Sequence, residues 1–152
     1  MNVPLLRSTL GAIVVGFAVC ACATATNYAP VFVVPNEPSS PFSGVVRVDH
    51  LLFVSGQIGI DADSVTKPVV SRTARETARA LDHIQALLVT AGSSLDRVAR
   101  CTVMLADMKD WQEMNQAYDS YFPKHRPARS SFGATGLALG ARVEIECIAT
   151  VD

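Results

Sequence analysis

One arginine and two glutamates near the end of the chain combine residue types and spacing that could perform chemistry. Arg129 lies in the run RPARSS at 126–131, and Glu144 and Glu146 alternate in the strand-like run VEIE at 143–146. A guanidinium held between Pro-Ala and two serines suits bidentate capture of a small planar carboxylate. A carboxylate on a neighbouring strand could then handle water or protons. A solvated arginine and outward-facing glutamates would give the same pattern, so local chemistry alone leaves both interpretations open.

The composition bounds the classes of function. The chain has 152 residues and no internal repeat, which fits one compact domain after an N-terminal segment. Its formal net charge at pH 7 is −1. It lacks the Lys/Arg cluster that nucleic-acid binding requires, so we expect no nucleic-acid partner. The three histidines are isolated from one another and from the later cysteines, so their spacing gives no support to a zinc site.

The N-terminal segment has the pattern of an export signal. Arg7 is its only charge, and the apolar run at 8–19 is too short to span a bilayer comfortably. The run VCACA at 19–23 is similar to a bacterial lipoprotein cleavage box, with Cys22 as the lipidated residue, although an overlapping small-residue site allows ordinary cleavage. We predict a signal peptide at 1–21 and export to the periplasm, with any membrane attachment made only through a lipid on Cys22. A buried N-terminal helix of a cytosolic protein is the alternative.

The two later cysteines, Cys101 and Cys147, both lie within apolar strand-like runs. Export would allow a disulfide between them. Cysteines in such runs are most often buried free thiols, so we predict two separate thiols.

Prolines among small and polar residues predict a tether at 22–40, with one apolar run at 31–34 that could add an edge strand. The domain proper is predicted at 41–152. It begins with a β-hairpin over 45–54, after which Ser55-Gly56-Gln57 breaks the second strand.

A helix and a strand come next. Thr73 and Glu76 predict a capping box at the start of the helix, and Gly92 ends it. The apolar residues at helical spacing are Ala74, Ala78, Leu81, Ile84 and Leu88. Residues 98–105 alternate as a half-buried strand does, with one side formed by Cys101, Val103 and Leu105.

A second helix is predicted to start with a capping box of Asp110 and Glu113 and to stop at Pro123. Its apolar face consists of Trp111, Met114, Tyr118, Tyr121 and Phe122. Two further strands are predicted at 130–137 and 142–151.

The order of these elements predicts an α+β fold, with a mixed sheet and two helices on one of its faces. The other face has no intrachain cover, although Ile148 and Thr150 would lie on it. We therefore expect other subunits to supply the missing layer, which gives an obligate oligomer with clefts at the seams.

Several ordered motifs carry a family resemblance: Pro-Phe at 41–42, FVSGQI at 53–58, NQAY at 115–118, PARS at 127–130 and VEIE at 143–146. Over 41–151 the chain resembles the RidA (YjgF-type) reactive-intermediate deaminases, and the ordered combination is far more specific than any single motif. The resemblance implies a chorismate-mutase-like fold, a homotrimer and no metal or organic cofactor. It also implies hydrolysis of 2-imino acids, such as 2-iminopropanoate formed from 2-aminoacrylate, or 2-iminobutanoate, to 2-keto acids and ammonia. The family's substrates are those that pyridoxal-phosphate enzymes release through enamines, so the resemblance implies such a source here too.

Carried over residue by residue, the resemblance implies that Arg129 grips the substrate carboxylate, which a lysine could not do in the same way. Glu144 would position or activate the attacking water, and Glu146, which has the same strand parity, ranks second. Gly56 would let the backbone approach the ligand. Further substrate contacts would come from Phe42, Ser55, Gln57, Asn115, Tyr118, Ser130 and Ser131. Asn115 and Tyr118 could equally be structural residues of their helix.

Two residues depart from the family pattern. Phe42 stands where many members have a tyrosine, so a hydroxyl is lost while the ring can still line the cleft. Ser131 stands where they have a cysteine, so thiol reactivity is lost while a backbone contact can persist. The functional alternative is a non-catalytic module of the same fold that binds small carboxylates or a protein partner at the subunit clefts.

Overall fold

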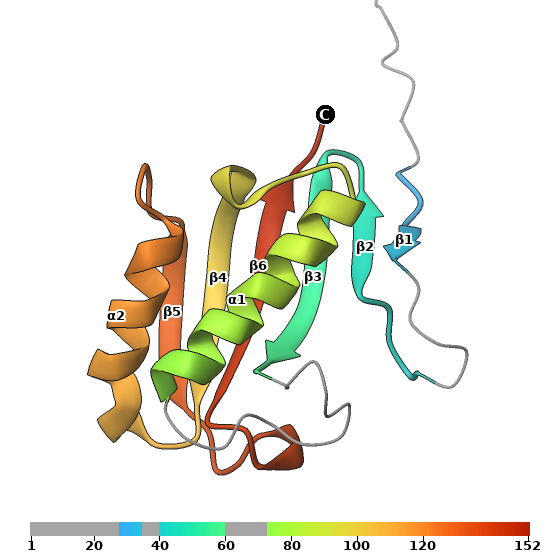
Figure 1. The fold of residues 1–152 in the computed structure, drawn as a ribbon. Coiled ribbons are helices and arrows are strands. Elements are labelled where there is room, and N and C mark those ends of the chain that lie inside the picture. Colours follow the sequence, from blue (N-terminus) through green and yellow to red (C-terminus); the bar gives the residue numbers. More distant parts are fainter. Residues whose placement is uncertain (1–27, 35–39, 60–72) are drawn as a thin grey trace, which may run out of the picture.

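The computed structural model describes residues 28–34, 40–59 and 73–152 (Figure 1). The predicted signal peptide at 1–21 and Cys22 lie outside these residues, as does most of the tether predicted at 22–40. The strands are β1 (Val31–Val34), β2 (Val45–Val48), β3 (Leu51–Ile58), β4 (Val98–Leu105), β5 (Ala128–Gly133) and β6 (Val143–Thr150). The helices are α1 (Thr73–Thr90) and α2 (Trp111–Tyr121), with short 3-10 turns at Leu95–Arg97, Met108–Asp110 and Ala138–Gly140.

The described strands form one mixed sheet in the order β1-β2-β3-β6-β4-β5. Neighbours are antiparallel except β4 and β5, which run parallel because α2 carries the chain back between them. Both helices lie on one face of the sheet, with α1 across β3 and β6 and α2 near the β5 edge (Figure 1). The predicted α+β architecture is confirmed, and the run at Val31–Val34 does form an edge strand.

Strand β3 continues through the segment where the sequence predicts a break. Val54 pairs with Cys147 and Gln57 pairs with Ile145, so the two residues between them form a bulge opposite a single residue of β6. A bulge bends its strand and changes the direction of nearby side chains. The predicted break was wrong because a glycine within a strand can mark a bulge without ending the pairing.

Neither predicted capping box forms. Glu76 turns inward, and its Oε2 accepts the backbone N–H of Arg142 at 2.7 Å. Asp110 makes no side-chain cap to α2, and its Oδ2 instead accepts from Nε of Arg142 at 3.1 Å. A tertiary partner thus replaces the local bonds at both helix starts. The end of α1 is as predicted, because Gly92 follows it in the left-handed region with φ 78°.

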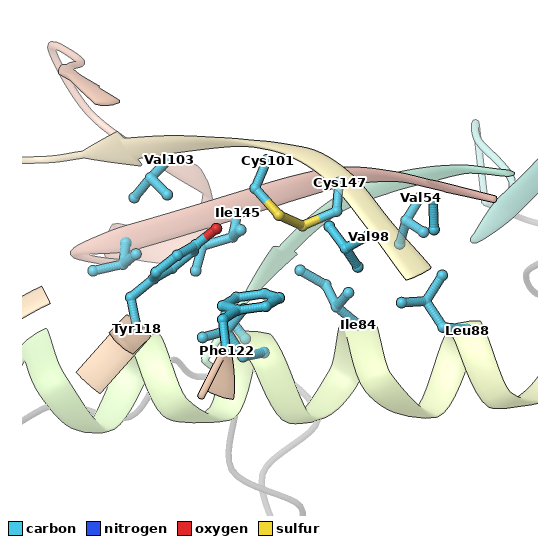
Figure 2. Close-up of a cluster of buried hydrophobic side chains, with 14 of the residues drawn as sticks. Val54, Ile84, Leu88, Val98, Cys101, Val103, Tyr118, Phe122, Ile145 and Cys147 are labelled. Atoms are coloured by element: carbon cyan, nitrogen blue, oxygen red, sulfur yellow. A yellow bond between two sulfur atoms is a disulfide. The ribbon is translucent and has the colours of Figure 1, made fainter. Parts of the chain in front are cut away.

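The hydrophobic core lies between the helices and the sheet (Figure 2). On α1 the predicted Leu81, Ile84 and Leu88 are fully buried, but Thr77 and Ala80 take the places expected for Ala74 and Ala78. On α2 the buried residues are Met114, Tyr118 and, just after the helix, Phe122, whereas Trp111 is 44% exposed. Periodicity predicts the face of a helix but not how far along its axis that face stays covered.

Cys101 and Cys147 form a disulfide between β4 and β6, which contradicts the prediction of two separate thiols. They are register partners on antiparallel strands, with Cα atoms 4.1 Å apart. The bond lies on the helix-facing side of the sheet, near the rings of Tyr118 and Phe122 (Figure 2). The prediction failed because alternation shows which face a cysteine occupies, but not which residue it meets on the neighbouring strand.

The opposite face of the sheet has no covering layer among the described residues (Figure 1). Ile148 and Thr150 lie on it as predicted, because they alternate with buried residues of β6. Phe53 and Phe132 are 41% and 49% exposed there. Strand β5 ends at Gly133, before the predicted end at 137. Within the part of the chain that the structure describes, no helix combines the length and apolar character needed to cross a membrane.

Candidate functional site

Arg129 projects from β5 toward α2 and contacts three of its side chains. Nη2 donates to Asn115 Oδ1 at 2.6 Å, and the guanidinium carbon lies 4.6 Å from the centre of the Tyr118 ring. Nη1 lies 3.9 Å from Met114 Sδ. Among the described carboxylates, none forms an ion pair with Arg129. We call Arg129, Asn115 and Tyr118 the Arg129 region. A half-buried guanidinium without a counter-charge is suited to an anionic ligand.

An open cavity of about 830 Å³ lies beside this guanidinium. Its lining includes Trp111, Gln112, Asn115, Asp119, Arg126 and Arg129. Arg126 is neutralised by Asp119, with Nε and Oδ1 2.8 Å apart. Arg129 is therefore the lining cation whose charge is left for a ligand, and the cavity has ample room for a small carboxylate.

The hydroxyl groups of Tyr118 and Ser131 are buried without a hydrogen-bond partner among the described residues. Burial raises the pKa of Tyr118 to about 12, against a weaker opposing effect of Arg129. The phenol therefore stays protonated at neutral pH. Tyr118 gives Arg129 a neutral aromatic surface and is not suited to exchanging protons there.

Glu144 lies on β6, on the uncovered face of the sheet. Its carboxylate sits over Gly56 of β3, because a Cβ added at Gly56 would overlap Glu144 Oε1 and lie 3.0 Å from its Cδ. Gly56 thus makes room for the glutamate side chain, in addition to its predicted closeness to a ligand. No described residue donates a hydrogen bond to the carboxylate of Glu144, which leaves its lone pairs available to water or substrate.

The loop that carries Phe42 is tied to the same bulge. Ser55 Oγ donates to the carbonyl of Ser43 at 2.7 Å, and the Ser55 N–H donates to the carbonyl of Gly44 at 3.0 Å. Phe42 itself is 56% exposed. Gln57 is occupied locally, since its Nε2 donates to the carbonyl of Ser55 at 2.9 Å. We call Glu144 with the bulge and the Phe42 loop the Glu144 region.

Two of the remaining predicted residues, Glu146 and Ser130, also lie on the uncovered face. Ser130 Oγ accepts a bond from Nη2 of Arg100 at 3.4 Å. Glu146 and Arg100 line a small hollow of about 110 Å³ together with Phe53. Glu146 is therefore separate from the Gly56 position, beside which Glu144 lies.

One chain does not bring the two regions together. Arg129 is the register partner of Cys101, and both side chains point to the helix-covered face. Glu144 alternates with Val143 and Ile145, which are buried on that face, so its side chain points to the other one.

The sequence did not predict that Glu76, Asp110 and Arg142 contact one another. They form a polar cluster where β6 begins. Glu76 and Asp110 were assigned to helix caps, and only the order of the strands in space shows that both meet Arg142. A buried position for Glu76 within the helical period was the signal that could have revealed a tertiary partner. In the described ranges, no three His, Cys, Asp or Glu side chains gather closely enough to hold a metal ion.

The chain is thus a small α+β protein in which a half-buried arginine and, on the other face of the sheet, a glutamate both lack an ion-pair partner among the described residues. Residues 34–151 match the family model described as Endoribonuclease L-PSP, and the chain belongs to this family, which is also known as YjgF/RidA. It is 38% identical over 109 residues to a 2-iminobutanoate/2-iminopropanoate deaminase of Mus musculus, covering 72% of this chain and 80% of that protein. It is also 38% identical over 113 residues to the RutC family protein UK114 of Drosophila melanogaster, covering 74% and 81%.

Solved structures with a similar fold agree with this family assignment. The crystal structure of the yeast protein YEO7 superposes with a TM-score of 0.73 at 32% identity, covering 82% of this chain and all of that one. The predicted family and its fold are therefore confirmed.

Proposed function

We propose that this protein hydrolyses reactive 2-imino acids, including 2-iminopropanoate and 2-iminobutanoate, to 2-keto acids and ammonia. The observation that carries this proposal is the half-buried Arg129, which is held by Asn115 and Tyr118 and has no carboxylate partner among the described residues. The relatives named 2-iminobutanoate/2-iminopropanoate deaminase, at about 38% identity, support the same activity.

The reaction needs orientation more than strong catalysis, because an imine carbon is already electrophilic. Arg129 binds the substrate carboxylate through two parallel N–H donors and so fixes the imine carbon. Glu144 accepts a proton from water while the water oxygen bonds to that carbon, and the proton then passes to the nitrogen. The added hydroxyl group then gives its proton to the nitrogen by way of Glu144, so the C–N bond breaks with loss of ammonia while the C=O bond of the keto acid forms. Holding the reactants in place could supply much of the rate enhancement.

The proposal includes an assembly of several copies, with a homotrimer as the form that the family resemblance implies. Arg129 and Glu144 lie on opposite faces of the sheet in one chain, so a complete site needs Arg129 of one copy and Glu144 of the next. The exposed Phe53 and Phe132 on the uncovered face support such packing.

The function is tested by generating 2-aminoacrylate or 2-iminobutanoate with an amino-acid dehydratase and following keto-acid release. Wild-type protein should accelerate release, and Arg129→Lys should lower kcat/KM about 100-fold, since lysine keeps the charge but loses the two-pronged bond. Arg126→Lys is the matched control, because Arg126 is already paired with Asp119. No acceleration by wild type would reject this activity and leave the non-catalytic binding module. Equal activity of Arg129→Lys would reject the carboxylate clamp.

The family model is described as an endoribonuclease, but the net charge of −1 and the lack of a basic cluster do not favour RNA as the substrate. Incubation of the same protein with single-stranded RNA tests that activity directly.

We also propose that the protein is exported, with cleavage after residue 21 and lipidation at Cys22. The Cys101–Cys147 disulfide supports this location, because disulfides persist mainly in oxidising compartments. Mass spectrometry of the mature N-terminus checks the proposal. A diacylglycerol-modified Cys22 is expected, and an unmodified terminus at Thr24 would exclude the lipid anchor.

A further inference from the structure

Arg142 joins three elements at the point where β6 begins. Its backbone N–H donates to Glu76 Oε2 at 2.7 Å, which links β6 to α1. Its Nε lies 3.1 Å from Thr73 Oγ1, in the first turn of the same helix. Its Nη2 forms an ion pair with Asp110, which immediately precedes α2. One residue, two positions before Glu144, therefore connects the sheet to the starts of both helices.

Glu76 is an unusual residue to find inside the core. Its side chain is among the largest that are fully buried, with 1% of the residue exposed. Desolvation raises its pKa, while the backbone N–H groups of Arg142 and Val143 and the charge of Arg142 oppose the rise, and Asp110 adds to it. Burying a carboxylate is costly even when it is paired, and an apolar residue of similar volume is often as stable or more stable. Stability alone therefore does not account for a glutamate at this position.

Glu76 lies between the end of β3 and the start of β6. A Cβ added at Gly59, just after β3, would come within 2.5 Å of Glu76 Cα and 2.7 Å of its carbonyl oxygen. The absence of a side chain at Gly59 lets the first turn of α1 press onto the end of β3. Glu76 thereby reaches from α1 to the adjacent start of β6. These are the two strands that carry Gly56 and Glu144, so Glu76 contacts both at the end where the Glu144 region lies, through its backbone beside Gly59 and through its carboxylate at Arg142.

We propose that Glu76 and Arg142 are positioning residues that set the place of the Glu144 carboxylate in the reaction. This inference rests on the proposed deaminase function. Glu76 holds the backbone of β6 immediately before Glu144. Arg142 then ties the same backbone to Asp110, and the helix that follows Asp110 carries Asn115, the partner of Arg129. The polar cluster thus couples the strand that carries the glutamate to the helix that holds the arginine.

Two substitutions of similar volume at Glu76 distinguish a positioning role from a role in filling the core. Glu76→Gln keeps an oxygen that accepts the Arg142 N–H, whereas Glu76→Met keeps the length and helix propensity but has no such acceptor. In the keto-acid assay we expect Glu76→Met to lower kcat about 10- to 100-fold with KM within about twofold, because a small displacement of a catalytic group has effects of this size. Glu76→Gln should retain kcat within about threefold. An unchanged kcat in a folded Glu76→Met protein would overturn the proposal.

Hydrogen exchange of the backbone amides at 141–146 measures the same placement without any substrate. We expect faster exchange in Glu76→Met and wild-type protection in Glu76→Gln. If exchange in Glu76→Met is unchanged, Glu76 does not fix β6. A wild-type protein that releases no keto acid would instead reject the deaminase function, and the exchange comparison would still decide whether Glu76 holds the strand.

Arg142→Met provides a second variant if Glu76→Met does not fold. Its side chain is 46% exposed, and the substitution keeps the backbone N–H while removing the contacts to Thr73 and Asp110. It should lower kcat about threefold or more, with little change in KM. Arg97→Met is the matched control, because it breaks the ion pair with Asp152 at the other end of β6 and should leave kcat unchanged. Equal kcat values for the two variants would overturn the role of Arg142.

Discussion

The Arg129 region and the Glu144 region are built in different ways. Arg129 is held by side chains, with a hydrogen bond to Asn115 and the ring of Tyr118 beneath it. Glu144 is placed by backbone, through the β3 bulge and the missing side chain of Gly56, and no described residue bonds to its carboxylate. The first region is prepared to bind within one chain. The second presents an unpaired carboxylate on a face that lacks a covering layer.

Within one chain the Arg129 side chain has its partners, whereas the Glu144 carboxylate has none among the described residues. Arg129 is oriented by contacts within its own chain, so under the proposed function its contribution to substrate affinity would belong to the single chain. Glu144 lies on the opposite face of the sheet, so under the proposed function it would act on a carboxylate bound at Arg129 of another copy. We therefore expect substitutions of Glu144 to change mainly kcat and substitutions of Arg129 to change mainly KM.

The largest effect is expected for Glu144→Gln, which removes the base but keeps the shape. We predict a fall in kcat of about 100- to 10,000-fold with KM almost unchanged, whereas Arg129→Lys acts mainly through KM. Steady-state keto-acid release by both variants measures the split. Glu146→Gln is the matched control on the same strand face and should retain most of the activity. A kcat unchanged in Glu144→Gln, or lost equally in Glu146→Gln, would remove the distinction between the two regions.

The next effect concerns the bond that lies between the regions. Cys101 is paired in register with both Arg129 and Cys147, so the disulfide joins the strand next to Arg129 to the strand that carries Glu144. Replacing both cysteines by alanine should lower the free energy of unfolding by about 2–4 kcal/mol, measured by urea denaturation. Keto-acid release at 25 °C should change less than twofold, since pairing of β4 and β6 remains. An unaltered urea midpoint would show that the bond does not stabilise the sheet.

The smallest effect is expected for Tyr118→Phe, which changes only the Arg129 region. The pKa of Tyr118 is raised to about 12 from 10.0 by burial, so the folded protein keeps a proton that the unfolded chain loses above pH 10. The free energy of unfolding of the wild-type protein therefore has its full contribution from Tyr118 below pH 10 and loses it as the pH rises toward 12. Phenylalanine removes that loss and keeps the aromatic surface under Arg129.

Urea unfolding of the two proteins at pH 8 and pH 11 tests this expectation. At pH 8 we predict a difference within about 0.5 kcal/mol, since the hydroxyl has no partner among the described residues. At pH 11 the variant should be the more stable one. A variant that loses stability equally at both values would mean that the hydroxyl has a bonding partner in the folded protein.

Local patterns in the sequence were sufficient for the order of the main helices and strands and for the faces of the strands, but not for every strand boundary. Alternation in β6 placed Glu144, Glu146, Ile148 and Thr150 on one side and was confirmed. The helix stop at Gly92 was also confirmed, because its left-handed backbone is a local property. The motifs around Arg129 and Glu144 identified the family, and their side chains occupy the positions described above.

What the sequence could not predict depends on which strands become neighbours. The Cys101–Cys147 bond, the inward turn of Glu76 and the pairing of Asp110 with Arg142 all join residues far apart in the chain. Each was assigned a local or solitary role because periodicity carries no information about register between strands. The bulge at Ser55-Gly56 was not predicted for a similar reason, since only the pairing of Gln57 with Ile145 shows that the strand continues.

A complementation experiment tests most directly whether the two regions meet between copies. Arg129→Lys and Glu144→Gln chains, carrying different affinity tags, are expressed together and purified through both tags. In a mixed trimer one seam of three would join an intact Arg129 to an intact Glu144, so we predict about a third of the wild-type activity per oligomer. Activity no higher than that of either variant alone would contradict a site shared between copies.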